Sequence, residues 1–170
     1  MRIVAGKYKR KNLITLTGDD TRPTKDMVKE AIFDTIQIKD SDFFLDLFSG
    51  SGAIGIEALS RGAYKVIFND NNIKAIEIIK KNLKSIEEEA YVYNLDSFIL
   101  LDKLKDKFNY IFIDPPYAYD KYDELIDKIH SLNLLNNGGL IIVEAHKDKV
   151  IKHTPIKEKK YGICKVLYFN

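Results

Sequence analysis

The sequence predicts a single α/β domain in which a mostly parallel sheet is covered by helices on both faces. Apolar runs typical of strands alternate with segments of helical periodicity from Asp42 to Ala145. Strands separated by helices are joined by right-handed crossovers and therefore run parallel. The chain has 170 residues, which is enough for one complete core and too few for two domains.

Residues 1–40 are predicted to form a basic hairpin and a helix ahead of the core. In "MRIVAGKYKRKNLITL" (1–16), two short apolar runs flank a basic turn that contains a glycine, which is typical of a hairpin. In "TRPTKDMVKEAIFDTI" (21–36), Thr24 is a candidate helix cap. The apolar positions that follow recur at helical spacing: Met27, Val28, Ala31, Ile32 and Ile36.

Residues 41–170 are predicted to form the core. Expected strands are 42–48, 63–70, 90–96, 108–116 and 138–145, and expected helices are 51–62, 72–86, 97–104 and 122–132. The final apolar runs, 149–160 and 161–169, have no helix between them, so we expect an antiparallel hairpin at one edge of the sheet.

Composition limits the classes of protein to which the chain can belong. Hydrophobic residues make up 45% and charged residues 31%, which is ordinary for a globular domain. No apolar run approaches the roughly 18 residues of a membrane span, and no secretory signal is apparent, so we expect a cytoplasmic protein without a membrane partner. Cys164 is the single cysteine, which favours a packed thiol. The spacing of the three histidines matches no zinc pattern, and we expect no metal.

Charge is distributed unevenly along the chain. The formal net charge is only +2, but the first eleven residues and the stretch 146–165 are rich in basic residues. Two basic ends on a near-neutral domain fit an anionic macromolecular partner. Lysines that are merely solvated fit this composition equally well.

The stretch "DLFSGSGAIG" (46–55) matches G-x-G-x-x-G through Gly50, Gly52 and Gly55, the pattern of a dinucleotide-binding loop. Asp70 follows about twenty positions later, as the pattern requires. Asp46, however, directly precedes the loop, where its charge would repel a pyrophosphate. A ligand with a cationic group fits better, and S-adenosylmethionine has an ammonium, a sulfonium and a carboxylate. The absence of a Cβ at Gly50 and Gly52 would let the main chain approach it.

Acidic residues also follow the second and third predicted strands, at the edge of the sheet where ligands bind. Asp70 is placed to accept both ribose hydroxyls. Asp96 is placed to accept the adenine amino group, with Ser97 beside it, and it is equally well placed to cap the helix 97–104.

The loop resembles the cofactor motif of class I S-adenosylmethionine-dependent methyltransferases, and the order of the motifs along the chain is similar. "YIFIDPPY" (110–117) resembles the [DN]-P-P-[YF] signature of methyltransferases that act on planar amino groups. Asp114 and the Pro115 carbonyl would accept the two N–H bonds of the amine, while the prolines contribute no competing donor. These acceptors would also stabilise the positive charge that develops on nitrogen. Tyr117 would stack on the base.

Almost the whole chain resembles the RsmD family, bacterial methyltransferases of one guanine N2 in small-subunit ribosomal RNA. The resemblance is carried by "RIVAGKYKRKNL", "TRPTKDMVKEAIFDTI", the core motifs and "YGICKVLYF". It implies a Rossmann-like methyltransferase fold and an Arg22-Pro23-Thr24 segment that closes over cofactor and substrate. The chain departs from the family at Arg10-Lys11, where Gly-Arg is common.

Residues and resemblance together predict three sets of site residues. Predicted catalytic residues are Asp114, Pro115, Pro116 and Tyr117. Predicted cofactor contacts are Asp46, Phe48, Ser49, Gly50, Ser51, Gly52, Asp70, Asn71, Asp96, Ser97 and Thr24. Predicted RNA contacts are Lys7, Lys9, Arg10, Lys11 and Arg22.

The predicted partner is ribosomal RNA or an assembling small subunit, and the predicted enzyme is a monomer. Since 170 residues leave no room for a separate recognition domain, specificity would come from RNA shape and from a base already out of its stack. Alternatives are an adenine-N6 methyltransferase of DNA or RNA, a non-catalytic assembly factor with the same fold and, more distantly, a dehydrogenase.

Overall fold

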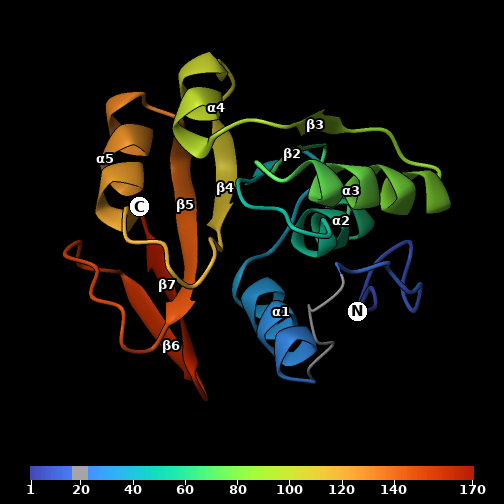
Figure 1. The fold of residues 1–170 in the computed structure, drawn as a ribbon, viewed down its shortest axis with the longest axis horizontal. Helices are drawn as coiled ribbons and strands as arrows, with labels where there is room; N and C mark the ends of the chain where they lie inside the picture. The colour runs from blue at the N-terminus through green and yellow to red at the C-terminus, as the bar shows by residue number, and fades with distance from the viewer. Residues whose placement is uncertain (17–22) are drawn as a thin grey trace.

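The computed structural model describes residues 1–16 and 23–170, with the side chains of residues 23–25 also outside the description. Its sheet contains β1 (Phe43–Asp46), β2 (Lys65–Asn69), β3 (Tyr91–Tyr93), β4 (Phe108–Ile113), β5 (Leu135–His146), β6 (Lys157–Tyr161) and β7 (Cys164–Phe169). The helices are α1 (Pro23–Thr35), α2 (Ala53–Ser60), α3 (Ile73–Ser85), α4 (Ser97–Lys103) and α5 (Tyr122–Ser131) (Figure 1).

The strand order is β3-β2-β1-β4-β5-β7-β6. Strands β1 to β5 pair in parallel, whereas β7 pairs antiparallel with both β5 and β6. The predicted fold class, including the antiparallel final hairpin at one edge, is therefore confirmed. The order reverses between β1 and β4, and such a switch point is where open α/β sheets bind their ligands.

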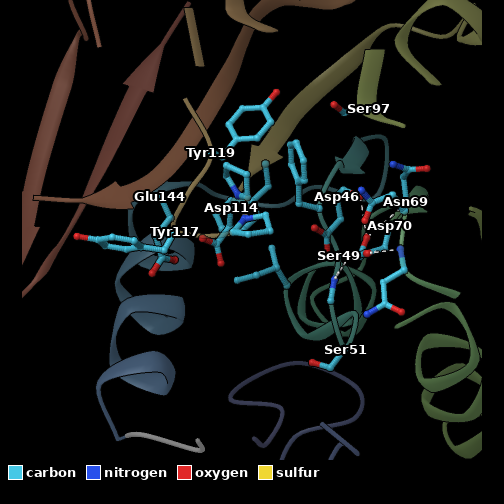
Figure 2. Close-up of a pocket in the computed structure, with 18 of the residues that line it drawn as sticks. Asp46, Ser49, Ser51, Asn69, Asp70, Ser97, Asp114, Tyr117, Tyr119 and Glu144 are labelled. Carbon is cyan, nitrogen blue, oxygen red and sulfur yellow. Dashed lines mark hydrogen bonds between the residues drawn. The ribbon is translucent and has the colours of Figure 1, made fainter. Parts of the chain in front are cut away.

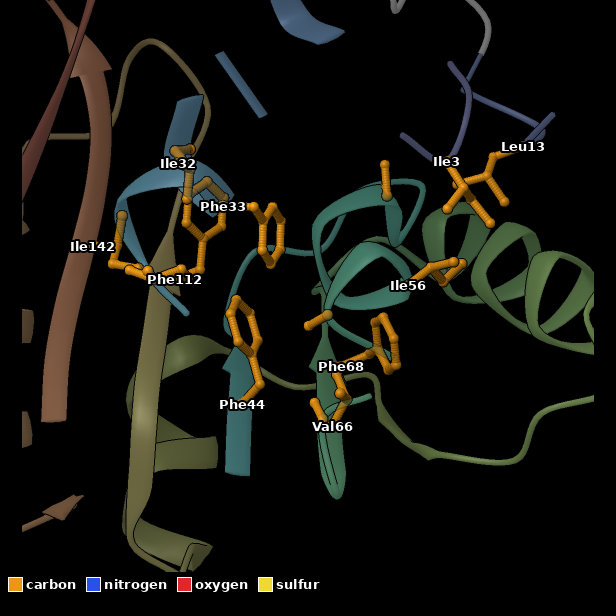
Figure 3. Close-up of a cluster of buried hydrophobic side chains, with 14 of the residues drawn as sticks. Ile3, Leu13, Ile32, Phe33, Phe44, Ile56, Val66, Phe68, Phe112 and Ile142 are labelled. Atoms are coloured by element: carbon orange, nitrogen blue, oxygen red, sulfur yellow. The ribbon is translucent and has the colours of Figure 1, made fainter. Parts of the chain in front are cut away.

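Helices cover both faces of the sheet, as the continuous apolar strands predict. Phe44 of β1 packs on the face covered by α1, α2 and α3, while Leu45 packs on the face covered by α4 and α5. Figure 3 shows the first of these clusters, in which Phe44, Phe68 and Phe112 from three strands meet Ile32 and Phe33 of α1 and Ile56 of α2. Because successive side chains of a strand point to opposite faces of the sheet, they pack in two separate cores.

Gly55 explains how closely α2 packs on the sheet. A Cβ at this position would lie 2.3 Å from the ring of Phe68 on β2. Any larger residue would push the helix away from the strand, and with it the loop that precedes the helix. The third glycine of the motif therefore serves helix–strand packing.

The N-terminal hairpin is less regular than predicted. It closes through one antiparallel bridge between Arg2 and Asn12, and neither arm forms a strand. Arg10 has a φ of 74°, which interrupts the extended geometry that a longer ladder needs. Three main-chain hydrogen bonds join the arms, including Ile3 N–H to the Lys11 carbonyl and Leu13 N–H to the Met1 carbonyl, each at 2.9 Å. The segment is also held by α2: Glu57, fully buried, accepts hydrogen bonds from the main-chain N–H groups of Val4 and Ala5 at 2.8 and 2.9 Å.

Glu57 also pairs with two cations. Arg61 Nε lies 2.9 Å from Oε1, and Lys29 Nζ of α1 lies 3.5 Å from Oε2. Lys29 is itself buried and donates to the carbonyl of Arg2. Because burial lowers the pKa of Lys29 while Glu57 raises it, the charged state depends on this pairing. The buried cluster ties the N-terminal segment, α1 and α2 together.

Candidate active site

A cavity of about 940 Å³ opens at the carboxyl ends of the parallel strands. It extends from the glycine loop after β1 to the Asp-Pro-Pro-Tyr corner after β4, so both predicted halves of the site share one space (Figure 2). Every predicted catalytic residue lines it. The predicted cofactor residues that line it are Asp46, Phe48, Ser49, Gly50, Ser51, Asp70, Asn71, Asp96 and Ser97.

Asp46 is a buried carboxylate at the floor of the cavity. Its side chain is held by the Gly55 N–H, which donates to Oδ2 at 3.0 Å. Oδ1 is buried and has no hydrogen-bond partner among the described residues. Burial raises the pKa of Asp46 to about 7. A buried oxygen without a donor is costly unless a ligand supplies one, and a cationic ligand group would do so.

Asp70 fixes the glycine loop from the end of β2. Its Oδ2 accepts from the Gly50 N–H at 2.9 Å and its Oδ1 from the Asn72 N–H at 2.8 Å. Gly50 has a φ of 53°, a left-handed conformation that glycine adopts without strain. Each carboxylate oxygen retains further acceptor capacity toward the cavity. The predicted ribose acceptor is thus also a structural brace of the loop.

Asn69 holds three strand ends together, a role that the sequence analysis did not assign. Its side-chain amide donates to the carbonyls of Leu47 and Leu95 at 3.2 and 3.0 Å and accepts from the Leu95 N–H at 3.2 Å. The Ser49 hydroxyl, in turn, accepts from the Asn69 N–H at 3.0 Å. The sequence signal for this role is an asparagine at the end of a predicted strand, directly before the acidic residue Asp70.

Asp96 caps α4, which confirms the predicted role as a helix cap. Its other predicted role, as an acceptor for the adenine amine, stays a prediction. Oδ1 accepts from the N–H groups of Phe98 and Ile99 at 2.9 and 3.4 Å. Among the described residues, Oδ2 accepts no hydrogen bond and is available to a ligand amine. Ser97, which is buried, lies beside it on the cavity wall.

The Asp114–Tyr117 corner leaves the sheet directly after β4, as predicted for two successive prolines. A turn follows in which the Tyr119 N–H donates to the Pro116 carbonyl at 2.8 Å. The Tyr117 ring is 71% exposed and meets the His146 ring edge-on, with centroids 5.0 Å apart. A flat aromatic face is therefore presented to solvent at the mouth of the cavity.

Glu144, which the sequence analysis missed, also lines the cavity. It lies on β5, where Val143 pairs with Ile113, so it stands beside the residue that follows β4, Asp114. Figure 2 shows the two carboxylates near one another beneath Tyr117. Burial and the neighbouring charge of Glu144 raise the pKa of the Cys164 thiol to about 11 and keep it protonated. Cys164 is thus a packed thiol, as predicted.

Of the predicted site residues Gly52, Arg22 and Thr24, only Gly52 is fully described by the structure. Gly52 is not among the residues that line the cavity: its φ is 80°, and a Cβ would meet Ile79 at 3.1 Å and Phe68 at 3.4 Å, so it serves the entry into α2. Arg22 lies outside the described residues. The helix α1 begins at Pro23, one residue before Thr24, so Thr24 does not precede the helix as a cap would; its side chain is outside the description.

The four predicted RNA contacts in the hairpin divide into two pairs. Lys7 Nζ lies 3.2 Å from Glu88, and Lys11 donates to the carbonyl of Ser85, so both are engaged with α3 and the turn after it. Lys9 and Arg10 are exposed at the tip of the hairpin, and neither makes an ion pair among the described residues. All four side chains are exposed, and Lys9 and Arg10 are the better candidates for contact with phosphates because they make no ion pair among the described residues.

Metal ligands and membrane spans are both absent from the described part of the chain. Within residues 1–16 and 23–170, no group of three or more histidine, cysteine, aspartate or glutamate side chains is arranged to hold a metal ion. No helix in the same ranges combines the length and the apolar character that crossing a bilayer demands.

Fold and cavity together define the class: a Rossmann-like domain of the class I methyltransferase type, with the glycine loop and the Asp-Pro-Pro-Tyr corner on either side of the switch point. The chain belongs to the family described as conserved hypothetical protein 95, whose model matches residues 1–170. Proteins named ribosomal RNA small subunit methyltransferase D, the predicted family, are relatives over most of its length.

One such relative, from Haemophilus influenzae, is 36% identical and aligns with 100% of this chain and 94% of its own. Another, from Escherichia coli strain K12, is 30% identical over 91% of this chain and 79% of its own. A Thermus thermophilus protein of solved structure superposes with a TM-score of 0.86 at 26% identity, covering 99% of this chain and 98% of the other.

Proposed function

We propose that this protein transfers a methyl group from S-adenosylmethionine to the exocyclic N2 amine of a guanine in small-subunit ribosomal RNA. Membership of the methyltransferase family supports ribosomal RNA methylation with this cofactor. The observation that carries the proposal is the shared cavity, because it brings a cofactor loop and an amine-holding corner into one space. The guanine-N2 assignment rests on the resemblance to the RsmD family.

The donor groups at the loop end of the cavity fit the cofactor. The orphaned Oδ1 of Asp46 suits the ammonium of the methionine part, and the first turn of α2, at Ala53 and Ile54, presents main-chain N–H groups for the carboxylate. Asp70 suits the ribose hydroxyls, and Oδ2 of Asp96 suits the adenine amine. S-adenosylmethionine supplies a methyl group on a sulfonium, which is already a good leaving group.

The chain's own part in catalysis is to hold and polarise the amine. An amine on an aromatic base is a poor nucleophile because its lone pair is delocalised into the ring. Asp114 and the Pro115 carbonyl would accept its two N–H bonds, favouring a pyramidal nitrogen and stabilising the positive charge that develops there. The Tyr117 ring would stack on the base and fix its orientation. Most of the remaining rate enhancement would come from positioning.

Ribosomal RNA as the substrate is supported by the names of the relatives and by the basic hairpin. Phosphate contacts from Lys9 and Arg10 would contribute affinity and little sequence preference. Sequence-specific reading of a duplex needs an element inserted in a groove, and a base in a catalytic cavity must leave its stack. We therefore expect the substrate to be an unpaired or splayed guanine in rRNA or in an assembling subunit.

Nucleoside analysis of small-subunit rRNA from a strain without this gene tests the proposal. We expect the loss of an N2-methylguanosine that returns when the wild-type gene is restored. Complementation with Asp114→Ala should not return it, although the variant protein accumulates and binds cofactor. Unchanged N2-methylguanosine in the deletion strain would contradict the proposal, and loss of an N6-methyladenosine in its place would identify the adenine alternative.

A further inference from the structure

Glu144 is placed on the substrate side of the cavity by the sheet itself. It follows Val143, which pairs with Ile113, and Asp114 follows Ile113 on the neighbouring parallel strand. Both carboxylates therefore emerge next to one another at the same edge of the sheet, and both line the cavity. Figure 2 shows Glu144 close to Asp114 and Tyr117, and far from Asp70 and Asn69 at the loop end.

The last strand holds Glu144 in this place. Glu144 pairs with Val166 of β7, and Cys164 lies two residues from Val166 on the same face of that strand. Burial and the charge of Glu144 keep the Cys164 thiol protonated, and the thiol donates to the Tyr161 carbonyl at 3.3 Å. A carboxylate carries roughly four acceptor positions, so Glu144 can accept from a ligand as well as interact with neighbours in the chain.

The chemistry of the bases gives such a carboxylate a specific use. In guanine, the amine lies between N1, which carries a proton, and N3, which is an acceptor, so N1–H and one N2–H bond point to the same edge. In adenine and cytosine, the ring nitrogen beside the amine is an acceptor. A carboxylate adjacent to the amine-holding corner attracts the guanine edge and repels the other two.

We propose that Glu144 accepts the N1–H of the target guanine and so selects guanine over bases whose adjacent ring nitrogen is an acceptor. This inference rests on the proposed function, and it assigns the choice of base to a residue outside the Asp-Pro-Pro-Tyr motif. Asp114 holds the amine that reacts, and Glu144 reads the atom next to it. Glu144 is thus a specificity-determining residue in the same cavity.

The test replaces the guanine with 2-aminopurine, which keeps the amine but has an acceptor in place of N1–H. The target nucleotide is mapped first, and RNA carrying guanine or 2-aminopurine there is assembled into small-subunit particles. Single-turnover methyl transfer is measured for wild type, Glu144→Gln and Glu158→Gln. Glu158, on β6 and outside the cavity, is the matched control for loss of one carboxylate.

Wild type and Glu158→Gln should favour guanine over 2-aminopurine by at least about tenfold, as expected when one hydrogen bond to a base edge is replaced by repulsion. In Glu144→Gln the preference should fall to about threefold or less, because the amide can donate to N1 as well as accept from it. Comparing ratios removes any difference in the intrinsic reactivity of the two amines. Cofactor affinity, measured by titration calorimetry, should be the same in all three proteins.

An unchanged ratio in Glu144→Gln, with wild type active on guanine N2, would overturn this inference and leave the proposed function standing. A wild-type protein that methylates neither particle would overturn both. Loss of cofactor binding in Glu144→Gln would also overturn it, because it would place Glu144 at the cofactor end or in the fold.

Discussion

The two ends of the cavity differ in how exposed their polar side chains are. At the glycine loop, Asp70, Asn69 and Ser49 are bonded to the main chain of neighbouring strand ends, and the loop is fixed before any ligand arrives. At the Asp-Pro-Pro-Tyr corner, Asp114 is exposed and the Tyr117 ring faces solvent. The cofactor end is thus fixed by buried main-chain contacts, whereas the substrate end presents exposed side chains to an incoming RNA.

The substitution Asp114→Ala tests the substrate end of the cavity and should have the largest effect. We expect methyl transfer to fall by about 100- to 1000-fold, the usual cost of removing one preorganised group that stabilises developing charge. Cofactor affinity should be nearly unchanged, because Asp114 lies at the opposite end of the cavity from Asp70. Single-turnover transfer from labelled cofactor, with a separate binding titration, measures both quantities.

Asp114→Asn is the matched control, since an amide oxygen still accepts one N–H bond, and its loss of rate should be smaller. A variant Asp114→Ala that turns over like wild type would show that the corner is a structural turn. The Asp-Pro-Pro-Tyr end of the cavity would then have no catalytic role through Asp114.

The substitution Asp46→Asn tests the cofactor end of the cavity. Burial raises the pKa of Asp46 to about 7, so the ligand-free protein gains stability from its protonation at low pH and loses that gain as pH rises through 7. Asparagine has no charge to bury, so the variant should unfold at higher denaturant than wild type above pH 7, by on the order of 4 kcal/mol at most. This difference should disappear near pH 4.

The same substitution should weaken cofactor binding, because a carboxylate facing an ammonium is replaced by an amide. We expect a loss of about 10- to 100-fold, the range for a charge-assisted hydrogen bond. Denaturant unfolding across pH and titration calorimetry at pH 8 measure the two effects. A variant that is both less stable at pH 8 and equally able to bind would show that Asp46 serves the fold and not the ligand.

The smallest expected effect extends the comparison to the basic hairpin. Lys9→Ala with Arg10→Ala should lower the slope of log affinity for RNA against log salt by about 0.7 to 0.9 for each phosphate that the variant no longer neutralises. Lys7→Ala with Lys11→Ala removes the same charge from side chains that already have partners in the chain. This second double variant is the control and should change the slope less. An equal change in the two double variants would show that Lys9 and Arg10 have no special role in contacting phosphates.

The sequence predicts the parts of this molecule that depend on local pattern. Alternating apolar segments predict the parallel sheet, and acids at strand ends predict Asp46, Asp70 and Asp114 around one cavity. Glu144 was missed because it lies within an apolar strand and no turn residue directly follows it. The Lys29–Glu57 pair was missed because residues 28 positions apart, each on a helix, show no local sign of meeting in the interior.

The two-stranded hairpin was over-predicted for a related reason. Apolar residues at Ile3 and Leu13 do face the interior, which is why the pattern looks like strands (Figure 3). Main-chain hydrogen bonds join the two arms at both residues, but the arms pair through a single bridge, and both side chains are buried against α2 and α3. Contacts over a long separation decided the conformation, and a local pattern carries no information about them.

The buried carboxylate of Glu57 bears on the order in which the chain is completed at the ribosome. Val4 and Ala5 are synthesised some fifty residues before Glu57, the group that accepts their N–H bonds at 2.8 and 2.9 Å. Until α2 has emerged, the segment around Val4 and Ala5 lacks its native acceptor. Docking of this segment therefore waits for the synthesis of residues more than fifty positions further along the chain.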